Sequence, residues 1–462
     1  MQFKQAIQQI SGFKYIIDSL NILSSAGRKQ LTTLPFLTQK NDIETALAET
    51  EKACEVINSP ETEKTLSLLF TKLMQLRDIS GTITFLSQKN VLNDVELFEI
   101  KHFALLAESI QEYVRELQLT FIEIPALEPV VKILDPEKKR IPHFYIYDQY
   151  SSVLASLRAQ LSRMSSNNYD EKEIESVRFQ AQRIEDEIRK DISKQLIPYA
   201  RDLSKALNEI ARLDILLAKA SQVKELGLCK PTIGEEKTDY IGLFHPEIKD
   251  SLQQQRKDFQ PIDISIPMQP TVITGANMAG KSVLLKSVAL AQTMAQFGFY
   301  VPAQSATVVL VEQIVISAGD GEDDLKGLSS FAAEMLRLNT SIHNTQKNIK
   351  QLVLIDELAR TTNPVEGKAL VCGMIDFLLQ HNVQSLITTH YSIDIPCRKL
   401  RVKGFTENKK NEKITIHNIN SFIDYSLEET TEKEVPHEAI NIAEIIGVDE
   451  KLLKKVKQYM MV

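Results

Sequence analysis

The fold of this chain is indicated most clearly by the stretch Gly275-Ala276-Asn277-Met278-Ala279-Gly280-Lys281-Ser282. This stretch fits the pattern Gly-x-x-x-x-Gly-Lys-Ser, a loop whose backbone N–H groups surround the phosphates of a nucleotide. Its glycines let the backbone approach the phosphate oxygens closely. Lys281 supplies a positive charge to the outer phosphates, and Ser282 offers a hydroxyl group to Mg²⁺. The motif therefore predicts a nucleotide site.

The residues on either side of the motif predict the setting that such a loop needs. Residues 271–274, Thr-Val-Ile-Thr, are typical of a short buried strand. Residues 282–297 carry Leu284, Leu285, Val288 and Leu290 and are typical of a helix. We therefore expect strand, loop and helix in that order. The amino-terminal end of the helix then points its dipole at the phosphates.

Composition indicates a globular protein of two or three domains. The 462 residues are 43% hydrophobic and 25% charged, which is ordinary for a chain with a sizeable core. The formal net charge of −7 argues against tight non-specific binding of nucleic acid by the whole surface. A local basic patch remains compatible with this charge.

Cysteine spacing and hydropathy indicate a reducing compartment. Cys54, Cys229, Cys372 and Cys397 form no Cys-x-x-Cys pair, so neither a zinc cluster nor a disulfide framework is expected. The polar amino terminus does not fit a signal peptide, and no run of 18 apolar residues predicts a membrane span. We expect a cytoplasmic protein.

Glycine usage predicts the organisation of the chain. Three of the 16 glycines lie before residue 227, where long apolar stripes of helical period predict helices. The best stripe spans residues 173–220 with a kink at Pro198, and residues 154–161 are expected to form the other arm of a helical hairpin. From about Thr232, short apolar runs at 308–311, 352–355 and 385–388 predict the buried strands of an α/β sheet. We expect domains at residues 1–230, 231–435 and 436–462, the last a short helical tail suited to dimerisation.

Two carboxylates and a histidine end two of these strands. Asp356 can hold Mg²⁺ and Glu357 can polarise an attacking water as a general base. His390 ends the strand at 385–388, and parallel strands place their carboxyl ends together, where ligands bind. Ser330 begins a predicted helix, where free N–H groups and a hydroxyl group suit an anion. Alone, such residues are more often structural, and their order after the phosphate loop favours the functional role.

These pieces together resemble the ATPase domain of the MutS family, a branch of the ABC-type ATPases. The phosphate loop resembles the family's Gly-Pro-Asn-Met-Gly/Ala-Gly-Lys-Ser, and residues 296–303 resemble its Gln-x-Gly-x-x-Val-Pro-Ala segment. Residues 323–331 resemble the family signature, and Asp356-Glu357 and Thr389-His390-Tyr391 complete the set. The resemblance covers residues 230–462 strongly and extends weakly forward to Asp18-Ser-Leu and Pro35-Phe-Leu. It implies an α/β P-loop ATPase domain preceded by an all-α helical core or lever domain.

The resemblance also implies site residues, with ATP and Mg²⁺ as cofactors. Lys281, Glu357 and His390 would be catalytic, and Ser282 and Asp356 would serve the metal. Ser330 would reach the γ-phosphate across a homodimer, or across a heterodimer with a related subunit. Tyr425 falls near a second adenine contact that is usually His. The nucleotide contacts would be Gly275, Ala276, Asn277, Met278, Ala279, Gly280, Lys281, Ser282, Val283, Phe259 as the adenine-stacking ring, and Ser330.

The chain also departs from the family pattern. Val283 replaces a threonine, Leu328 stands where a basic residue often precedes the signature, and residues 358–364 replace a glycine-richer loop. Relative to repair MutS proteins, we expect a short member that lacks the mismatch-recognition, connector and clamp regions.

Two macromolecules fit this sequence as the client, the partner on which the ATPase cycle would act. The first is damaged or branched DNA, which the family resemblance favours and which the basic stretch Arg398–Lys403 with Lys409 and Lys410 could contact. That stretch is also typical of a solvated hairpin. The second client is an adenosylcobalamin-dependent aminomutase, for which short MutS-like proteins of similar build resemble reactivating factors. A third interpretation, a degenerate ATPase serving as a structural dimer, is disfavoured by the intact Lys281, Asp356, Glu357 and His390.

Overall fold

The structure is a computed structural model that describes residues 1–166, 170–275, 280–317, 330–360, 362–405, 422–431, 443–444 and 447–460. The chain divides into two compact units. An α/β unit contains Met1–Ser19, Pro35–Ala48 and Gln222–Val462, and a helical unit contains Leu20–Leu34 and Glu49–Ser221. The sequence predicted domain boundaries near residues 230 and 435; in the structure two amino-terminal segments group with the α/β unit.

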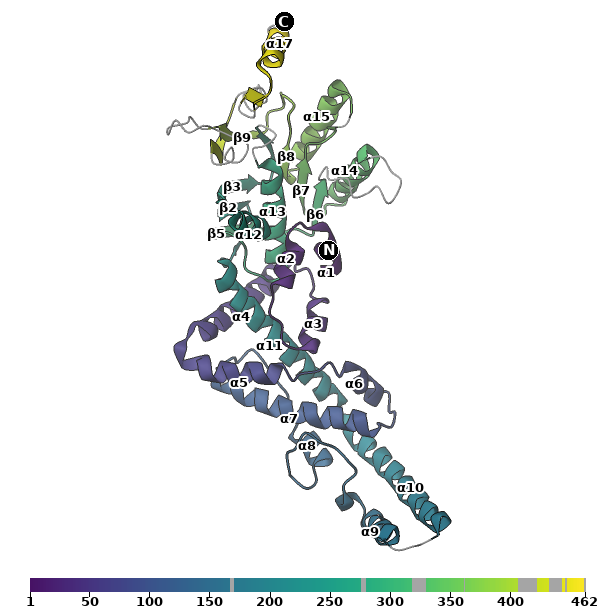
Figure 1. Ribbon diagram of the computed structural model, residues 1–462. Helices are drawn as coiled ribbons and strands as arrows, with labels where there is room; N and C mark the ends of the chain where they lie inside the picture. Colours follow the sequence, from purple (N-terminus) through teal and green to yellow (C-terminus); the bar gives the residue numbers. More distant parts are fainter. Residues whose placement is uncertain are drawn as a thin grey trace. The chain divides into compact units, whose positions relative to one another are not determined.

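The helical unit is built around one apolar core. Its helices contribute Leu69, Ile100, Leu134, Leu196 and Ile210, none of which is exposed. Helices α4 and α11 each carry residues of both units. The elements, drawn in Figure 1, are α3 (Ser25–Leu31), α4 (Lys40–Asn58), η1 (Pro60–Thr62), α5 (Glu63–Leu73), α6 (Ser80–Ser87), α7 (Asp94–Glu116), α8 (Glu128–Leu134), η2 (Asp148–Tyr150), α9 (Ser152–Ser166), α10 (Glu171–Leu196), η3 (Ile197–Tyr199) and α11 (Ala200–Leu226).

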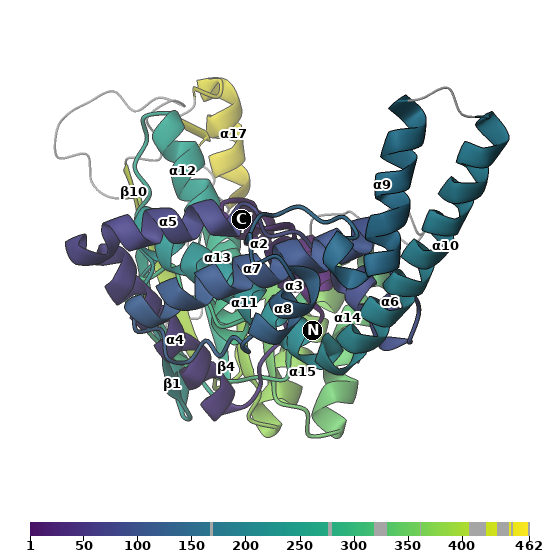
Figure 2. The same cartoon turned by 90° about the horizontal axis from the view of Figure 1, so that it is seen from below.

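Local sequence signals explain where these helices begin and break. Helix α7 begins at a capping box, because the Asn93 side chain accepts N–H bonds while Glu96 accepts from the Asn93 amide. The predicted kink at Pro198 is confirmed, since α10 and α11 are separated by the 3-10 turn η3 that contains this proline. The predicted helical hairpin is also confirmed: α9 and α10 lie side by side in Figure 2.

The α/β unit holds two sheets. Their elements and helices are α1 (Phe3–Gln9), α2 (Phe13–Asp18), β1 (Thr232–Gly234), β2 (Lys237–Leu243), α12 (Pro246–Gln254), β3 (Ile262–Pro267), β4 (Pro270–Thr274), α13 (Lys281–Gln296), β5 (Ser305–Val309), β6 (Gln313–Ser317), α14 (Ser330–Gln346), β7 (Gln351–Asp356), α15 (Pro364–Gln380), β8 (Gln384–Thr388), β9 (Arg398–Phe405), β10 (Ile423–Glu429) and α17 (Glu450–Met460). The four-stranded sheet has the order β1-β5-β2-β3, and the six-stranded sheet has the order β10-β9-β4-β8-β7-β6.

The six-stranded sheet is parallel from β9 to β6, and only the edge strand β10 runs antiparallel. Strands β4, β7 and β8 are almost fully buried, which suits strands covered on both faces. Val353, Ile355, Val371, Ile375 and Ile387 form part of one apolar cluster that joins the sheet to α15. Figure 1 shows α13, α14 and α15 around this sheet.

An aromatic cluster explains why the amino terminus belongs to the α/β unit. The rings of Phe3 and Phe13 lie 5.0 and 5.6 Å from that of Phe297, and Phe36 contacts the same ring at 5.4 Å. Because aromatic side chains bury a large apolar area, these contacts hold α1 and α2 against the end of α13.

The strands predicted at 271–274, 352–355 and 385–388 and the helix predicted at 282–297 are confirmed within a residue or two. The run at 308–311 also contains strand residues, but β5 begins and ends earlier, at Ser305 and Val309. A helical amino-terminal region is therefore followed by mixed α/β sheets. In the predicted tail, the described residues include helix α17 and the helical residues 443 and 444.

Candidate functional site

Strand register brings the predicted motifs to one edge of the six-stranded sheet. Thr388 of β8 pairs with Ile273 of β4 on one side and with Asp356 of β7 on the other. The amide of Thr389 continues the pairing by donating to the Ile273 carbonyl over 3.2 Å. The phosphate-loop strand, the paired carboxylates and the His390 strand therefore end in the same row, at the edge where parallel sheets bind ligands.

Lys281 is the first residue of α13 and lies beside the predicted base. Its ammonium donates to the Gly275 carbonyl over 2.6 Å and lies 3.6 Å from a Glu357 carboxylate oxygen. The Lys281 side chain is only 4% exposed. A buried ammonium is costly unless it is paired, so the loop carbonyl and the carboxylate stabilise it in this conformation.

The backbone at both described ends of the phosphate loop requires glycine. Gly275 has φ +147° and Gly280 has φ +73°. A Cβ at residue 280 would also lie 2.9 Å from the Tyr425 ring. The sequence motif thus matches the local conformation where the structure describes it.

Thr388 holds the two carboxylate residues in place. Its hydroxyl donates to Asp356 Oδ1 over 2.6 Å and accepts from the Glu357 amide over 3.0 Å. Sequence reasoning assigned no role to Thr388. A hydroxyl residue at the end of an apolar strand, directly before the Thr389-His390 pair, was the available signal.

Ser282 and Asp356 fit Mg²⁺ by the chemistry of their oxygen atoms. Ser282 is exposed at the start of α13, and Asp356 is the last residue of β7 and partly exposed. Hydroxyl and carboxylate oxygens are the ligands that this hard cation prefers.

His390 is exposed and lies two residues after the end of β8. Its ring lies 4.1 Å from that of Tyr391, which is nearly buried. The structure thus places His390 at the shared edge and leaves its imidazole open to solvent.

The two predicted adenine contacts are linked through one glutamine. Gln260 follows Phe259, and its side-chain oxygen accepts from the Tyr425 amide over 3.1 Å while its side-chain nitrogen donates to Asp424 over 2.8 Å. Phe259 is half-buried, and burial raises the pKa of Tyr425 above its ordinary value. The sequence placed Tyr425 only loosely, whereas its ring lies against Gly280 of the phosphate loop.

Some predicted residues lie outside the described part of the chain. These are Ala276, Asn277, Met278 and Ala279, the side chain of Ser330, Leu328, and Lys409 and Lys410. Val283 is half-buried in the first turn of α13.

Three basic residues of the stretch on β9 have partners within the chain, two of them on the neighbouring strand β10. Arg398 pairs with Glu429 at 2.6 Å, Lys403 lies 3.8 Å from Asp424, and the Lys399 ammonium donates to the Ile393 carbonyl. This pairing favours the solvated-hairpin interpretation of the stretch.

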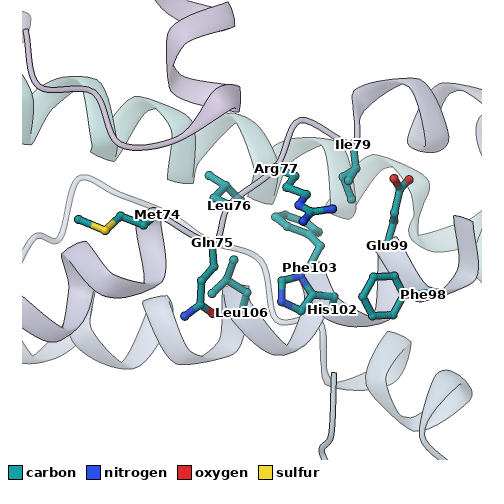
Figure 3. Close-up of a pocket in the computed structure, with 10 residues that line it drawn as sticks. All are labelled: Met74, Gln75, Leu76, Arg77, Ile79, Phe98, Glu99, His102, Phe103 and Leu106. Carbon is teal, nitrogen blue, oxygen red and sulfur yellow. The ribbon is translucent and has the colours of Figure 1, made fainter. Parts of the chain in front are cut away.

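A separate pocket of about 360 Å³ lies in the helical unit. Its lining includes the buried side chains of Leu76 and Phe103 and the more exposed side chains of Arg77 and His102 (Figure 3). The His102 ring stacks on Phe98 with centroids 5.8 Å apart, and burial together with the Arg77 guanidinium lowers the pKa of His102. None of these lining residues was predicted, and the sequence carries no motif that marks them.

Comparison with known proteins defines the class of this unit. Residues 271–461 match the family model of MutS domain V, which is an ATPase domain. The DNA mismatch repair protein MutS of Shouchella clausii is 34% identical over 203 residues, 44% of this chain and 23% of the relative. The endonuclease MutS2 of Thermus thermophilus is 35% identical over 222 residues, 46% of this chain and 28% of the relative. The MutS of Staphylococcus saprophyticus is 29% identical over 268 residues, 55% of this chain and 30% of the relative.

The carboxy-terminal half of the chain is therefore homologous to MutS and MutS2, and the predicted family resemblance is confirmed. The matched segments span less than a third of each of these relatives. In the described residues, no helix is both long and apolar enough to cross a membrane.

Proposed function

We propose that this protein is a MutS-like ATPase that binds and hydrolyses ATP with Mg²⁺ and uses the cycle to switch a dimer between two states. The observation that carries the proposal is the convergence of Lys281, Glu357 and His390 at one sheet edge, with the Lys281 ammonium 3.6 Å from the Glu357 carboxylate. The match to MutS domain V supports the same assignment.

Each residue has a role that follows from its chemistry. The phosphates of ATP replace Glu357 and the Gly275 carbonyl as partners of Lys281, which frees the Glu357 carboxylate to accept a proton from the attacking water. Ser282 and Asp356 hold Mg²⁺, which neutralises charge on the phosphates. His390 contacts the terminal phosphate or orients water. Phe259 and Tyr425 flank the adenine ring.

Ser330 completes the site from a second subunit. Helix α14 begins at this residue, so its free N–H groups and hydroxyl suit the γ-phosphate of the partner's ATP. ATP then stabilises the closed dimer, and hydrolysis releases it.

DNA is the client that we propose, because relatives of this chain are named DNA mismatch repair proteins and an endonuclease. Arg398 and Lys403 of the basic stretch have acidic partners within the chain, so the proposal of a DNA client does not rest on this stretch. The alternative client, an adenosylcobalamin-dependent aminomutase, is favoured by no contact in the described residues.

The proposal is tested by ATP binding and steady-state hydrolysis with and without heteroduplex and branched DNA. Lys281→Ala should raise the Kd for ATP at least about 30-fold, because it removes a buried charge partner of the phosphates. Glu357→Gln should bind ATP with little change and lower kcat about 100-fold or more, because the general base is lost.

Wild-type ATP affinity in Lys281→Ala would contradict the site. Wild-type turnover in Glu357→Gln would contradict the role of the base. A third outcome is ATP hydrolysis that depends on Lys281 and yet responds to neither heteroduplex nor branched DNA. That result would support the ATPase assignment and contradict DNA as the client.

A further inference from the structure

The turn that follows Glu357 has an unusual backbone. Glu357 has φ +51° and Ala359 has φ +60°, so two residues with side chains adopt the left-handed conformation within three positions. L-residues disfavour this conformation because the Cβ atom approaches the carbonyl oxygen. Such a turn persists only where its surroundings hold it.

Two side chains from different elements hold Ala359. The Glu334 carboxylate, in the first turns of α14, accepts from the Ala359 amide over 3.2 Å. The Tyr391 hydroxyl donates to the Ala359 carbonyl over 3.4 Å. Ala359 itself has no exposed surface. We call these three residues the Ala359 latch.

Glu334 acts in the latch as a hydrogen-bond acceptor. Burial raises the pKa of Glu334, while the Ala359 amide and the nearby Arg337 and Arg360 guanidinium groups oppose that rise. A carboxyl oxygen accepts an N–H bond whether or not the group is ionised. A glutamine oxygen can therefore replace it.

A glycine keeps the tyrosine side of the latch in position. A Cβ at Gly367, on α15, would lie 2.3 Å from the Tyr391 hydroxyl oxygen and 3.2 Å from the Ala359 carbonyl. Backbone and side chain are therefore packed too closely here for any other residue. By contrast, a Cβ at Gly373 on the same helix would meet no atom within 4 Å.

We propose that Glu334 and Tyr391 are positioning residues that set the direction of the Glu357 carboxylate through the Ala359 latch. The latch joins three parts of the site: α14, which begins at Ser330, the turn after the base, and the residue next to His390. A displacement of α14 on dimer closure is thereby passed to the general base. This inference rests on the proposed ATPase function.

The test compares four variants of the full chain by steady-state ATPase kinetics, by binding of a fluorescent ATP analogue and by thermal unfolding. Glu334→Ala should lower kcat about 10- to 100-fold, because a misplaced catalytic group loses its reactive geometry. Its affinity for the analogue should stay within about twofold of wild type, because Lys281 is untouched. Glu334→Gln should restore most of the kcat.

Gly367 and Gly373, both on α15, test the Tyr391 side of the latch as a variant and its matched control. Gly367→Ala should lower kcat with unchanged nucleotide affinity, whereas Gly373→Ala should keep wild-type kinetics. A merely structural role of Glu334 would instead lower the Tm and nucleotide affinity together. That result, or a Glu334→Ala kcat within about twofold of wild type, would overturn the latch.

The outcomes for Glu357→Gln separate this inference from the proposed function. If that variant loses turnover and Glu334→Ala does not, the ATPase stands and the latch is wrong. If Glu357→Gln hydrolyses ATP like the wild type, Glu357 is not the general base. The latch then has no catalytic group to position and is also wrong.

Discussion

At the scale of single residues, a buried ion pair in the helical unit stands out. The Lys101 ammonium on α7 donates to Asp135 over 3.0 Å and to the Tyr147 hydroxyl over 2.7 Å, and its side chain has no exposed surface. The other Asp135 oxygen accepts from the Arg140 amide over 2.7 Å. Burial alone raises the pKa of Asp135, but the bonds from Arg140 and Lys101 outweigh it and hold the pKa below its ordinary value.

Lys101→Met should lower the free energy of unfolding by about 3–5 kcal/mol, because it leaves the Asp135 charge buried without its partner. Lys132→Met is the control, since Lys132 and its partner Glu128 are both more than half exposed and such pairs contribute at most about 1 kcal/mol. Urea denaturation of the two variants measures the difference. If both variants lost the same free energy of unfolding, the Lys101–Asp135 pair would contribute no more than a surface ion pair.

Asp135 also makes the loss of stability in Lys101→Met depend on pH. A depressed folded-state pKa contributes stability above the unfolded value, about 3.9 for Asp, which is lost as the pH falls through the folded value. In Lys101→Met the burial of Asp135 is no longer opposed by the ammonium, so its pKa should rise; the destabilisation should therefore be largest at neutral pH and shrink as the pH falls and the unpaired carboxyl protonates.

At the scale of elements, side chains at the end of α13 opposite the phosphate loop bond to two other segments of the chain, at Leu37 and at residues 309–311. The Gln296 side-chain nitrogen donates to the carbonyls of Leu37 and Val311 over 2.8 and 2.7 Å, and its oxygen accepts from the Val311 amide and from Gln292. Gln292 donates in turn to the Val309 carbonyl over 2.9 Å. Gln296 opens the Gln-x-Gly-x-x-Val-Pro-Ala segment, so these bonds supply a physical reason for that glutamine.

Gln296→Leu should lower the free energy of unfolding by at least about 2 kcal/mol, because buried carbonyl and amide groups lose their partners. Gln253→Leu, at an exposed position of α12, is the control and should change stability by less than about 0.5 kcal/mol. Urea denaturation is again the measurement. A neutral Gln296→Leu would mean that water or a rearranged side chain replaces these bonds.

At the scale of the whole molecule, the exposed face of α17 is the feature that a second copy could cover. Leu452, Val456 and Tyr459 recur at helical spacing and are 54%, 37% and 85% exposed, while Leu453 is buried. Three apolar side chains on one face of a helix are typical of an interaction surface. The sequence predicted a dimerisation element in this segment, which stays a prediction.

The double variant Val456→Glu with Tyr459→Ser should shift the protein toward the monomer by at least about tenfold in the dimer dissociation constant, because it buries a charge in an apolar contact. Light scattering coupled to size-exclusion chromatography, with and without ATP, measures the change. Lys455→Gln, on the same helix, is the control. An unchanged dimer would place the dimer contact outside α17.

Much of the candidate site was predictable from sequence because its signals are local. The phosphate loop, the buried strand before Asp356 and the helix from Lys281 each depend on spacing within about ten residues. The partners of these groups were not predictable. Thr388 contacts Asp356 across 32 positions of sequence, and Glu334 contacts Ala359 across 25, with no pattern that links them.

The sequence by itself determined the helical front half, the strands and helix around the phosphate loop, the chemistry of that loop and the kinship with MutS, since periodicity and turn residues act over short distances. Only the tertiary structure decided that Leu37 meets Gln296, 259 positions away, and that the two amino-terminal segments join the α/β unit. Strand register and packing between distant segments depend on the shapes of all the side chains that meet. That information is distributed over the whole chain and is carried by no single motif.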